Sequence, residues 1–356
     1  MNAESTAMKV WFTKGLSNTV DAMAMIANDP LGRKMSILGS HVEAIQPLRA
    51  AWPQFLVEPR ALKGREYADW VYDTAVQHKV DLIIAQRQPR SLWPERARFA
   101  DAGIHLLVPA TPQVLDILDD KLLFQNDLAH AELSEAGVFG HAAIPFSNVA
   151  EFDAGRDQLV ASGKAIYGVC VKPVTGIFGS GFRRIDEDGN DFDRLVSTDQ
   201  EDLYRISLDG FRLALSRATE LRQMIVMPYL PGLERSVDFV AHQGQMIAGV
   251  ARVKTGKHQV LEVAVPAIEI ARVLARRSGL NGQCNLQTRE IDGRQVVLEI
   301  NARMSGGMAM ACLAGVNLPL LAVLSAAGLP YPDPAGLIGN LLVGMIEQAR
   351  ILNSDP

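Results

Sequence analysis

Short apolar runs alternate with segments of helical periodicity over the first third of the chain. The runs have the β-branched and aromatic composition of strands and stand at 9–13 (KVWFT), 34–40 (KMSILGS), 55–60 (FLVEPR), 81–86 (DLIIAQ) and 103–110 (GIHLLVPA). Between them, residues 66–80 place an apolar stripe on one helix face, made of Ala68, Val71, Tyr72, Ala75 and Val76. Strands separated by helices predict a parallel sheet with right-handed crossovers, and therefore an α/β fold.

Two runs near the C-terminus, 284–290 and 295–303, alternate with period two around the turn signal Asp292–Gly293. Apolar residues stand at the even positions Cys284, Leu286, Val296, Leu298, Ile300 and Ala302, and polar residues stand at the odd positions Asn285, Gln287, Arg289, Glu299, Asn301 and Arg303. The runs keep a common parity only across a loop with an odd number of residues. We therefore predict a three-residue loop, 291–293, with Gly293 left-handed, which pairs Gln287 with Val297 and sets Gln287 diagonal to Glu299.

The polar face of this strand pair offers oxygen ligands. The side chains of Gln287, Glu299 and Asn301 suit Mg²⁺, an ion that keeps several waters and bridges phosphates. Arg303, one step further along, suits a carboxylate or phosphate through its fork of donors. A solvated strand face accounts for the same polar residues and stays open as the alternative.

A glycine-rich loop follows the strand-like segment that ends at Lys172. Gly176, Gly179 and Gly181 surround Ser180, so that backbone N–H groups could form an anion cradle. The spacing is neither a P-loop nor a dinucleotide fingerprint, since the segment after it is strand-like. An ordinary glycine-rich hairpin is the competing interpretation.

The segment 226–239 reads as a strand, a Pro231–Gly232 turn and a second strand. Main-chain groups from Met227 to Leu230 could meet the edge of an adenine, and Glu234 could accept a sugar hydroxyl. Taken alone, Glu234 is better explained as an exposed turn glutamate. Lys121, taken alone, is a solvated helix lysine.

Together and in order, these segments resemble the ATP-grasp superfamily, close to its carbamoyl-phosphate-synthase-like branch. The resemblance covers most of the chain and rests on DDK, VKPVTGIFGSGF, MPYLPGLERSVDF, CNLQ and LEINARMSGG. It implies an N-terminal Rossmann-like pre-ATP-grasp domain at 1–112 and a two-lobed ATP-grasp domain at 113–356. The implied lobes are a nucleotide-covering lobe near 140–227 and a metal and substrate lobe near 228–356.

The resemblance also implies a role for each matching residue. Lys121 and Lys172 would contact ATP phosphates, Lys172 also lying near the adenine, and the loop from Gly176 through Gly179, Ser180 and Gly181 would fold over the triphosphate. Met227, Tyr229 and Leu230 would meet the adenine and Glu234 the ribose; Met227 departs from the glutamate that many relatives have there. Gln287, Glu299 and Asn301 would bind Mg²⁺ or Mn²⁺, and Arg303 would contact the carboxylate or acyl phosphate.

These roles imply a ligase that forms C–N bonds and releases ADP. A substrate carboxylate would attack the γ-phosphate of ATP, and the acyl phosphate would then meet an amine or another nucleophile. Neither the acid nor the nucleophile is identified by the sequence. Arg252 and Lys254 could contact a phosphate or the substrate, or they could lie on a solvated strand face, and the role of His258 stays open.

Composition narrows the setting. The 356 residues are 48% hydrophobic and carry a net charge of −5, which gives no basic footprint for nucleic acid and no polybasic membrane patch. Three scattered cysteines, with no membrane-spanning run and no signal peptide in view, predict a cytoplasmic protein. A homodimer is expected by analogy with relatives alone.

Two other functions compete with the ligase. One is a non-catalytic ATP-binding regulator on the same fold, against which the intact set of metal ligands counts. The other is a nucleotide-binding oxidoreductase, suggested by the first βα unit, where Gly15 stands without the three-glycine fingerprint.

Overall fold

The computed structural model describes residues 7–14, 18–43, 49, 51–52, 54–176, 179–199, 201–220, 222–256, 258–346 and 349. It divides into two compact units. The first unit comprises 1–115, 235–286 and 300–356, and the second comprises 116–234 and 287–299. This division crosses the domain boundaries expected from the sequence, which remain a prediction. Gly15 lies outside the described residues.

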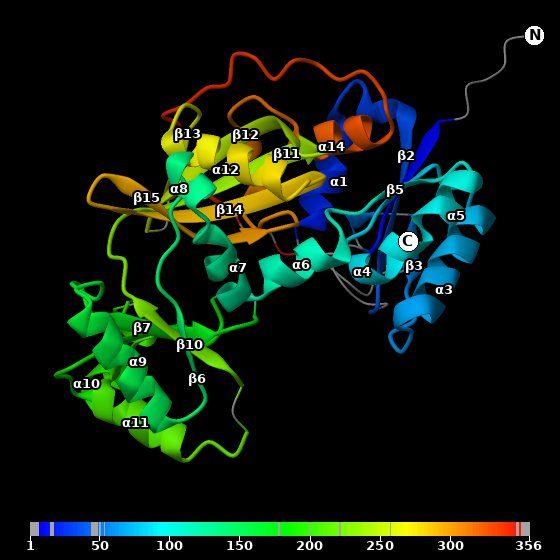
Figure 1. The fold of residues 1–356 in the computed structure, drawn as a ribbon. Helices are drawn as coiled ribbons and strands as arrows, with labels where there is room; N and C mark the ends of the chain where they lie inside the picture. The colour runs from blue at the N-terminus through cyan, green and yellow to red at the C-terminus, as the bar shows by residue number, and fades with distance from the viewer. Residues whose placement is uncertain are drawn as a thin grey trace, which may run out of the picture. The chain divides into compact units, whose positions relative to one another are not determined.

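The first unit contains the parallel sheet that the apolar runs predict (Figure 1). Its strand order is β3-β2-β1-β4-β5, and every pair of neighbours is parallel. The strands are β1 (Met8–Phe12), β2 (Met35–His41), β3 (Phe55–Val57), β4 (Leu82–Ile84) and β5 (His105–Leu107). The prediction of a parallel α/β arrangement is confirmed.

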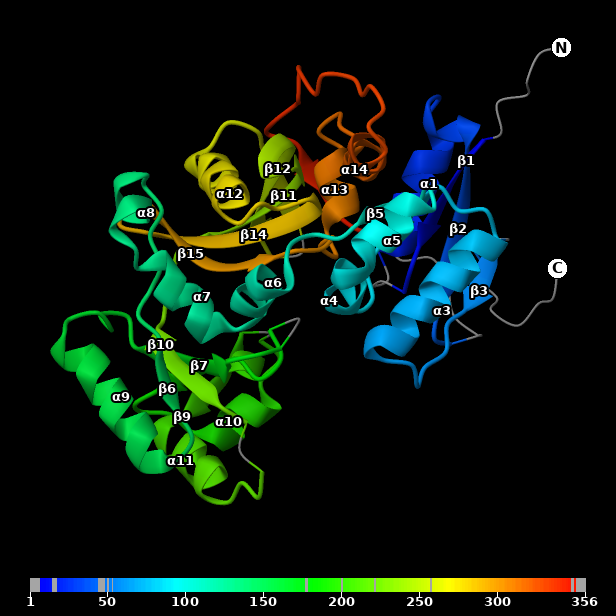
Figure 2. The ribbon, with the colours of Figure 1, turned by 45° about the vertical axis from the view of Figure 1, so that its right-hand side comes forward.

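Helices cover both faces of this sheet (Figure 2). One face packs on α3 (Gly64–Gln77) and α5 (Arg96–Asp101), and the other on α1 (Thr19–Asn28) and α14 (Leu318–Ala326). Because both faces are covered, adjacent residues such as Val10, Trp11 and Phe12 are all buried. Short helical turns complete this part: η1 (Gly32–Lys34), α4 (Pro89–Leu92) and η2 (Trp93–Glu95).

The remainder of the first unit is antiparallel. The strands β11 (Glu234–His242), β12 (Gln245–Thr255), β13 (His258–Glu262) and β16 (Leu342–Val343) pair in sequence order. The β11–β12 turn is the expected Gln243–Gly244, with φ of +48° and +76°. The helices here are α12 (Pro266–Arg277) and α13 (Met308–Cys312).

The second unit has its own five-stranded sheet, in the order β6-β10-β7-β8-β9. Its core contains three phenylalanines, Phe146, Phe152 and Phe211, whose ring centroids lie 4.8 to 6.1 Å apart. The strands are β6 (Ile144–Phe146), β7 (Val169–Pro173), β8 (Arg183–Asp186), β9 (Arg205–Ser207) and β10 (Met224–Pro228). Helix α6 (Pro112–Asp119) contains the boundary after residue 115. The helices that follow it in the second unit are α7 (Lys121–Leu128), α8 (Ala131–Glu135), α9 (Val149–Ala161), α10 (Asp191–Val196), η3 (Asp202–Tyr204) and α11 (Leu208–Ser216).

The strand pair with the alternating pattern is β14 (Gly282–Ile291) and β15 (Arg294–Asn301). Only two residues connect them, Asp292 with φ of +49° and Gly293 with φ of +75°. The expected three-residue loop is therefore wrong, although Gly293 has the left-handed conformation that was expected. A two-residue turn with both φ values positive matches the right-handed twist of a hairpin, so no extra residue is needed. The pairing of Gln287 with Val297 rested on the longer loop and loses its basis.

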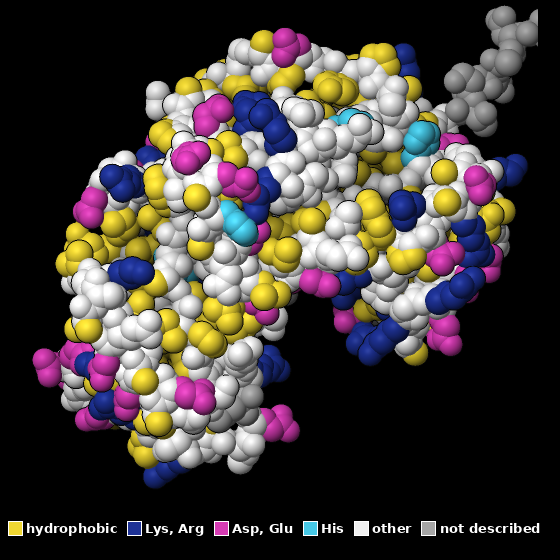
Figure 3. Space-filling view, viewed as in Figure 1, with side chains coloured by type: hydrophobic (Ala, Val, Ile, Leu, Met, Phe, Trp, Pro, Cys, Tyr) yellow, Lys and Arg dark blue, Asp and Glu magenta, His cyan; other side chains and the backbone are white. Residues whose placement is uncertain are grey.

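Charges of both signs are interspersed on the face shown in Figure 3. Within the part of the chain that the structure describes, none of the helices combines the length and apolarity that a membrane crossing requires.

Candidate functional site

The start of α7 fixes Lys121. The carboxylate of Asp120 accepts hydrogen bonds from the backbone N–H groups of Leu122 and Leu123, both at 2.9 Å, and so caps the helix. The backbone N–H of Lys121 donates to Val174 O at 3.0 Å, and its Nζ donates to Gly176 O at 3.1 Å. The side chain is 11% exposed. The interpretation of Lys121 as a solvated helix lysine is therefore wrong.

Glu299 lies beside this lysine. Its Oε2 is 3.8 Å from Lys121 Nζ, and its side chain is 27% exposed. The same helix holds the strand that carries it, because the Gln125 amide donates to Val297 O and Leu298 O, both at 3.1 Å. Helix α7 thus carries one charged partner of Glu299 and also positions the backbone of β15.

Lys172 joins the same charged group from β7. Burial lowers the pKa of this lysine, while the carboxylates of Glu299 and Glu234 raise it and the Lys121 ammonium lowers it. Two lysines and two glutamates of the second unit therefore influence one another. A cation that is costly to keep charged gains most from a strongly anionic ligand.

An apolar cluster lies next to these charges in the second unit. Cys170, Val174, Ile225 and Met227 are buried in it, and the partly buried side chains that pack against it include Leu122, Phe182, Tyr229 and Leu298. Leu298 of β15 and Leu122 of α7 thus pack against the same cluster. Apolar side chains of this kind can pack on an aromatic ring.

Backbone groups of the expected adenine hinge form hydrogen bonds within the protein. The Tyr229 N–H donates to Gly168 O at 2.9 Å, and Leu230 O accepts from Arg289 Nη1 at 2.8 Å. The Arg184 guanidinium lies 4.2 Å from the centre of the Tyr229 ring. Met227 is buried in β10 opposite Cys170.

Arg289 also determines the setting of Glu234. Its Nη2 lies 3.3 Å from Glu234 Oε2, and its Nη1 lies 3.3 Å from Gly232 O. A Cβ on Gly232 would lie 1.6 Å from Glu290 O, so only glycine fits in this turn. Glu234 is therefore a partly buried, ion-paired residue and not an exposed turn glutamate. The alternating strand pattern contained Arg289 but gave no sign of its partner.

The glycine loop connects β7 and β8. Gly179 and Gly181 have φ of +64° and +79°, and the Phe182 N–H donates to Gly179 O at 3.0 Å. Gly176 accepts from Lys121 as described above, and Ser180 lies in the turn. Ile177 and Phe178 lie outside the described residues, and the role of the loop as a flap stays a prediction.

His141 was not expected from the sequence. The backbone N–H of His141 donates to Gln125 Oε1 at 2.7 Å, and the ring Nδ1 lies 3.0 Å from Ala142 O. Burial and the nearby Lys172 lower its pKa to about 3, so the ring is neutral at physiological pH. Its contact depends on residues distant in sequence, and no motif of the chain marks it.

Two expected site residues belong to the first unit. Arg303 donates through Nη2 to Asn301 Oδ1 at 3.0 Å and lies 3.4 Å from Met304 O through Nη1. The side chains of Asn301 and Arg303 are half-buried. Gln287, which belongs to the second unit, is half-buried as well.

The expected metal ligands have the composition that Mg²⁺ uses when phosphates complete its shell. Among the described residues, no group of three His, Cys, Asp or Glu could hold a metal by itself. One carboxylate and two amide oxygens fit a hard cation that keeps other oxygen ligands. The residue types present therefore fit a metal–nucleotide complex.

Arg252, whose role the sequence left open, is 3% exposed. Its Nε donates to Asp238 Oδ2 at 2.6 Å, and its Nη2 donates to Ser236 Oγ and Ser305 Oγ at 3.1 and 3.0 Å. A solvated strand face is therefore the wrong description of Arg252. Lys254 and His258 are exposed.

Comparison with known proteins identifies the fold. A family model described as ATP-grasp in the biosynthetic pathway with Ter operon matches residues 220–349. The chain is similar to a Campylobacter jejuni biotin carboxylase in an ATP-analogue complex, with 13% identity, a TM-score of 0.61, and coverage of 94% of this chain and 74% of that one. It is also similar to an Aspergillus clavatus carboxyaminoimidazole ribonucleotide synthase complexed with ATP, with 14% identity, a TM-score of 0.61, and coverage of 92% and 78%.

The family model and these solved structures together show that the chain has the ATP-grasp fold. An L-amino acid ligase from Bacillus licheniformis gives a third likeness, with 15% identity, a TM-score of 0.56, and coverage of 90% of this chain and 74% of that one. At such identities the solved structures establish the ATP-grasp fold and not the reaction. No protein with a curated function matches the sequence.

Proposed function

We propose that this ATP-grasp protein is an ATP- and Mg²⁺-dependent ligase. It would activate a carboxylate as an acyl phosphate and join it to an amine or another nucleophile, releasing ADP and phosphate. The observation that carries the proposal is the group of Lys121, Lys172, Glu234 and Glu299, which lies beside an apolar cluster in one unit.

Each charged side chain has a role that follows from its surroundings. Lys121 and Lys172 would bind phosphate oxygens, and a phosphate would stabilise the charged form of Lys172 that burial disfavours. Glu299 would exchange its contact with Lys121 for the metal, aided by Gln287 and by Asn301 two residues further along β15. Arg303 would bind the carboxylate or the acyl phosphate. A bound Mg²⁺ or Mn²⁺ would offset phosphate charge during transfer.

The neighbouring apolar cluster would take the base. Met227, Tyr229 and Leu298 would contact the adenine, and Glu234, held by Arg289, would accept a ribose hydroxyl. Gly176, Gly179, Ser180 and Gly181 would cover the phosphates and exclude water, which limits hydrolysis of an acyl phosphate. The domain boundaries, a cytoplasmic location and a homodimer remain predictions within this proposal.

Turnover of the purified full chain tests the proposal. ADP release is measured with ATP, Mg²⁺ and a panel of carboxylates, each paired with several amines. Glu299→Gln should lower kcat by about 10²–10³, as expected when a group that stabilises the transferring phosphoryl is lost. Asp292→Asn removes the same charge from the exposed turn of the same hairpin and should leave kcat unchanged.

Equal turnover in the Glu299→Gln variant and the wild type would refute the assignment. Nucleotide binding without turnover for any pair of substrates would favour the ATP-binding regulator.

A further inference from the structure

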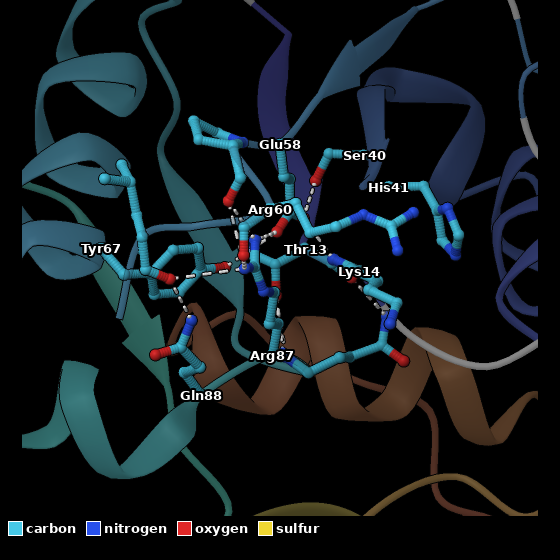
Figure 4. Close-up of polar contacts among 12 residues, drawn as sticks. Thr13, Lys14, Ser40, His41, Glu58, Arg60, Tyr67, Arg87 and Gln88 are labelled. Carbon is cyan, nitrogen blue, oxygen red and sulfur yellow. Dashed lines mark hydrogen bonds and ion pairs between the residues drawn. The ribbon is translucent and has the colours of Figure 1, made fainter. Parts of the chain in front are cut away.

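The carboxyl edge of the parallel sheet in the first unit gathers polar side chains (Figure 4). In the order β3-β2-β1-β4-β5, the strands β2 and β3 lie on one side of β1, and the next strands in the sequence, β4 and β5, lie on its other side. The connections that leave β1 and β4 therefore diverge at this edge. In open parallel sheets such a reversal point is where ligands bind.

The buried carboxylate of Glu58 and the groups that donate to it, called the acidic clamp below, hold the backbone at this edge. Glu58 is 1% exposed and accepts from Ser40 Oγ at 2.6 Å, Tyr67 OH at 3.1 Å and Arg87 Nη1 at 2.9 Å. It also accepts from the backbone N–H of Lys14, the second residue after β1. Burial and the Glu58 charge raise the pKa of Tyr67, which keeps it a hydrogen-bond donor.

Arg87 ties two further segments to this clamp. Its guanidinium lies 3.1 Å from Pro59 O and 3.2 Å from Arg60 O, and it stacks 4.6 Å from the centre of the Tyr67 ring. The connections after β1, β3 and β4 are thus fixed relative to one another. Such preorganisation lowers the cost of binding a ligand.

Three nitrogen-bearing side chains lie beside the clamp: Lys14, His41 and Arg60 (Figure 4). His41 Nδ1 accepts from the Glu43 N–H at 3.1 Å, so the neutral ring carries its proton on Nε2. Burial and the Lys14 ammonium lower the pKa of His41, while the carboxylates of Glu43 and Glu58 raise it. Arg60 Nη2 lies 3.3 Å from Glu43 Oε1 on an exposed surface.

We propose that Lys14, His41 and Arg60 bind an anionic group, a carboxylate or a phosphate, of a substrate at this edge. An anion would pair with Lys14, accept a hydrogen bond from His41 Nε2, and compete with Glu43 for Arg60. Naming the anion as part of a ligase substrate rests on the proposed function.

A contact within the first unit connects this edge to the segment that follows β15. Asn18 Nδ2 donates to Ser305 O at 2.6 Å, and Asn18 is 3% exposed. Its Oδ1 is buried and has no hydrogen-bond partner among the described residues. Thr19 Oγ1 lies 3.4 Å from Gln86 Oε1, and the Gln86 N–H donates to Thr13 Oγ1 at 2.9 Å, which continues the chain of contacts back to the end of β1. These contacts thus link the end of β1 to the segment that follows β15.

Anion binding to the full chain, saturated with Mg·ADP, tests the proposal. Succinate and inorganic phosphate are titrated separately by calorimetry, and the stronger of the two identifies the anion class. Lys14→Gln should weaken binding about tenfold, the loss expected for one charged hydrogen bond. Glu43→Gln should strengthen binding, because it releases Arg60 and removes a competing carboxylate.

Lys34→Gln is the matched control. Lys34 is exposed and directly precedes β2, whereas His41 ends β2, roughly 20 Å away at the rise of a strand. This variant should bind the anion as the wild type does. Equal losses in the Lys14→Gln and Lys34→Gln variants, or no binding of either anion to the wild type below 10 mM, would overturn the proposal.

His41 supplies a second readout that is independent of turnover. Its pKa, followed by proton NMR and assigned with His41→Gln, should rise in the free Lys14→Gln variant, because a nearby cation is lost. It should also rise when the anion is added to the wild type, so anion affinity should increase from pH 8 to pH 6. A pKa unmoved by anion would count against the site. If the wild type bound the anion but did not bind ADP, the proposed nucleotide site would be refuted and the anion site would stand.

Discussion

Lys172 shows how its surroundings set the charge of a single residue. Burial lowers the pKa of this lysine, and the carboxylate of Glu299 is the largest contribution that raises it. The charged form would be needed to bind a phosphate. Nucleotide affinity should therefore fall as pH rises through the pKa of Lys172.

This dependence gives a prediction for the Glu299→Gln variant. Without the glutamate charge the pKa of Lys172 is lower, so the loss of ADP affinity should begin at a lower pH than in the wild type. Calorimetric dissociation constants for ADP without metal, measured from pH 6 to pH 9.5, check this. The Asp292→Asn variant should follow the wild-type curve, and a Glu299→Gln curve superimposed on both would contradict the coupling.

The residues of the candidate site differ in how far the sequence could predict them. Glu299 stands out because a carboxylate in an apolar strand needs an explanation. Lys121 does not, since its engagement depends on Gly176, which is distant in sequence. Gln125, His141 and Arg289 were missed for the same reason, because their partners are brought together only by the fold.

At the scale of elements, strands and helices followed from apolar periodicity, whereas the parity of the β14–β15 hairpin did not. Burial of polar residues misled the parity argument: Thr288 Oγ1 donates to Gln295 Oε1 at 2.7 Å, and both side chains are buried. Asn285, assigned to a polar face, is 1% exposed and donates to Asp238 Oδ1 at 3.0 Å. Polarity in a strand does not report exposure when polar partners are available across it.

The β7–β8 connection allows a test of backbone conformation. Gly179 and Gly181 both have left-handed φ values, but a Cβ on Gly181 would lie 2.8 Å from the Pro173 ring, whereas one on Gly179 would meet open space. Gly179→Ala should cost about 1 kcal/mol from the left-handed backbone alone. Gly181→Ala should cost about 1 kcal/mol more, because the proline ring cannot yield freely.

Urea unfolding followed by near-ultraviolet circular dichroism compares these two variants. The midpoint should fall further for Gly181→Ala. Equal midpoints would mean that the loop relaxes away from Pro173.

At the scale of the whole molecule, the chain passes between the two compact units four times, after residues 115, 234, 286 and 299. Domain boundaries expected from sequence are contiguous, since motifs are read in chain order. The first unit is built from three separate segments, so its formation depends on strand pairings between residues far apart in the sequence. Apolar periodicity does not indicate which distant strands pair. Because each unit has its own core, a core substitution in one unit should leave the stability of the other unchanged.

The buried ion pair of the first unit should control the stability of that unit alone. Arg252 and Asp238 are 3% and 2% exposed, and Asn285 also donates to Asp238. Arg252→Met leaves an uncompensated buried carboxylate, which should cost about 3–5 kcal/mol. Lys254→Met, two residues along the same strand but exposed, should change stability by less than about 0.5 kcal/mol.

Hydrogen exchange should accelerate in β11 and β12 of the Arg252→Met variant, while β7 and β10, which pack on the phenylalanine core of the second unit, keep their protection. Equal acceleration in both units would show that they unfold together.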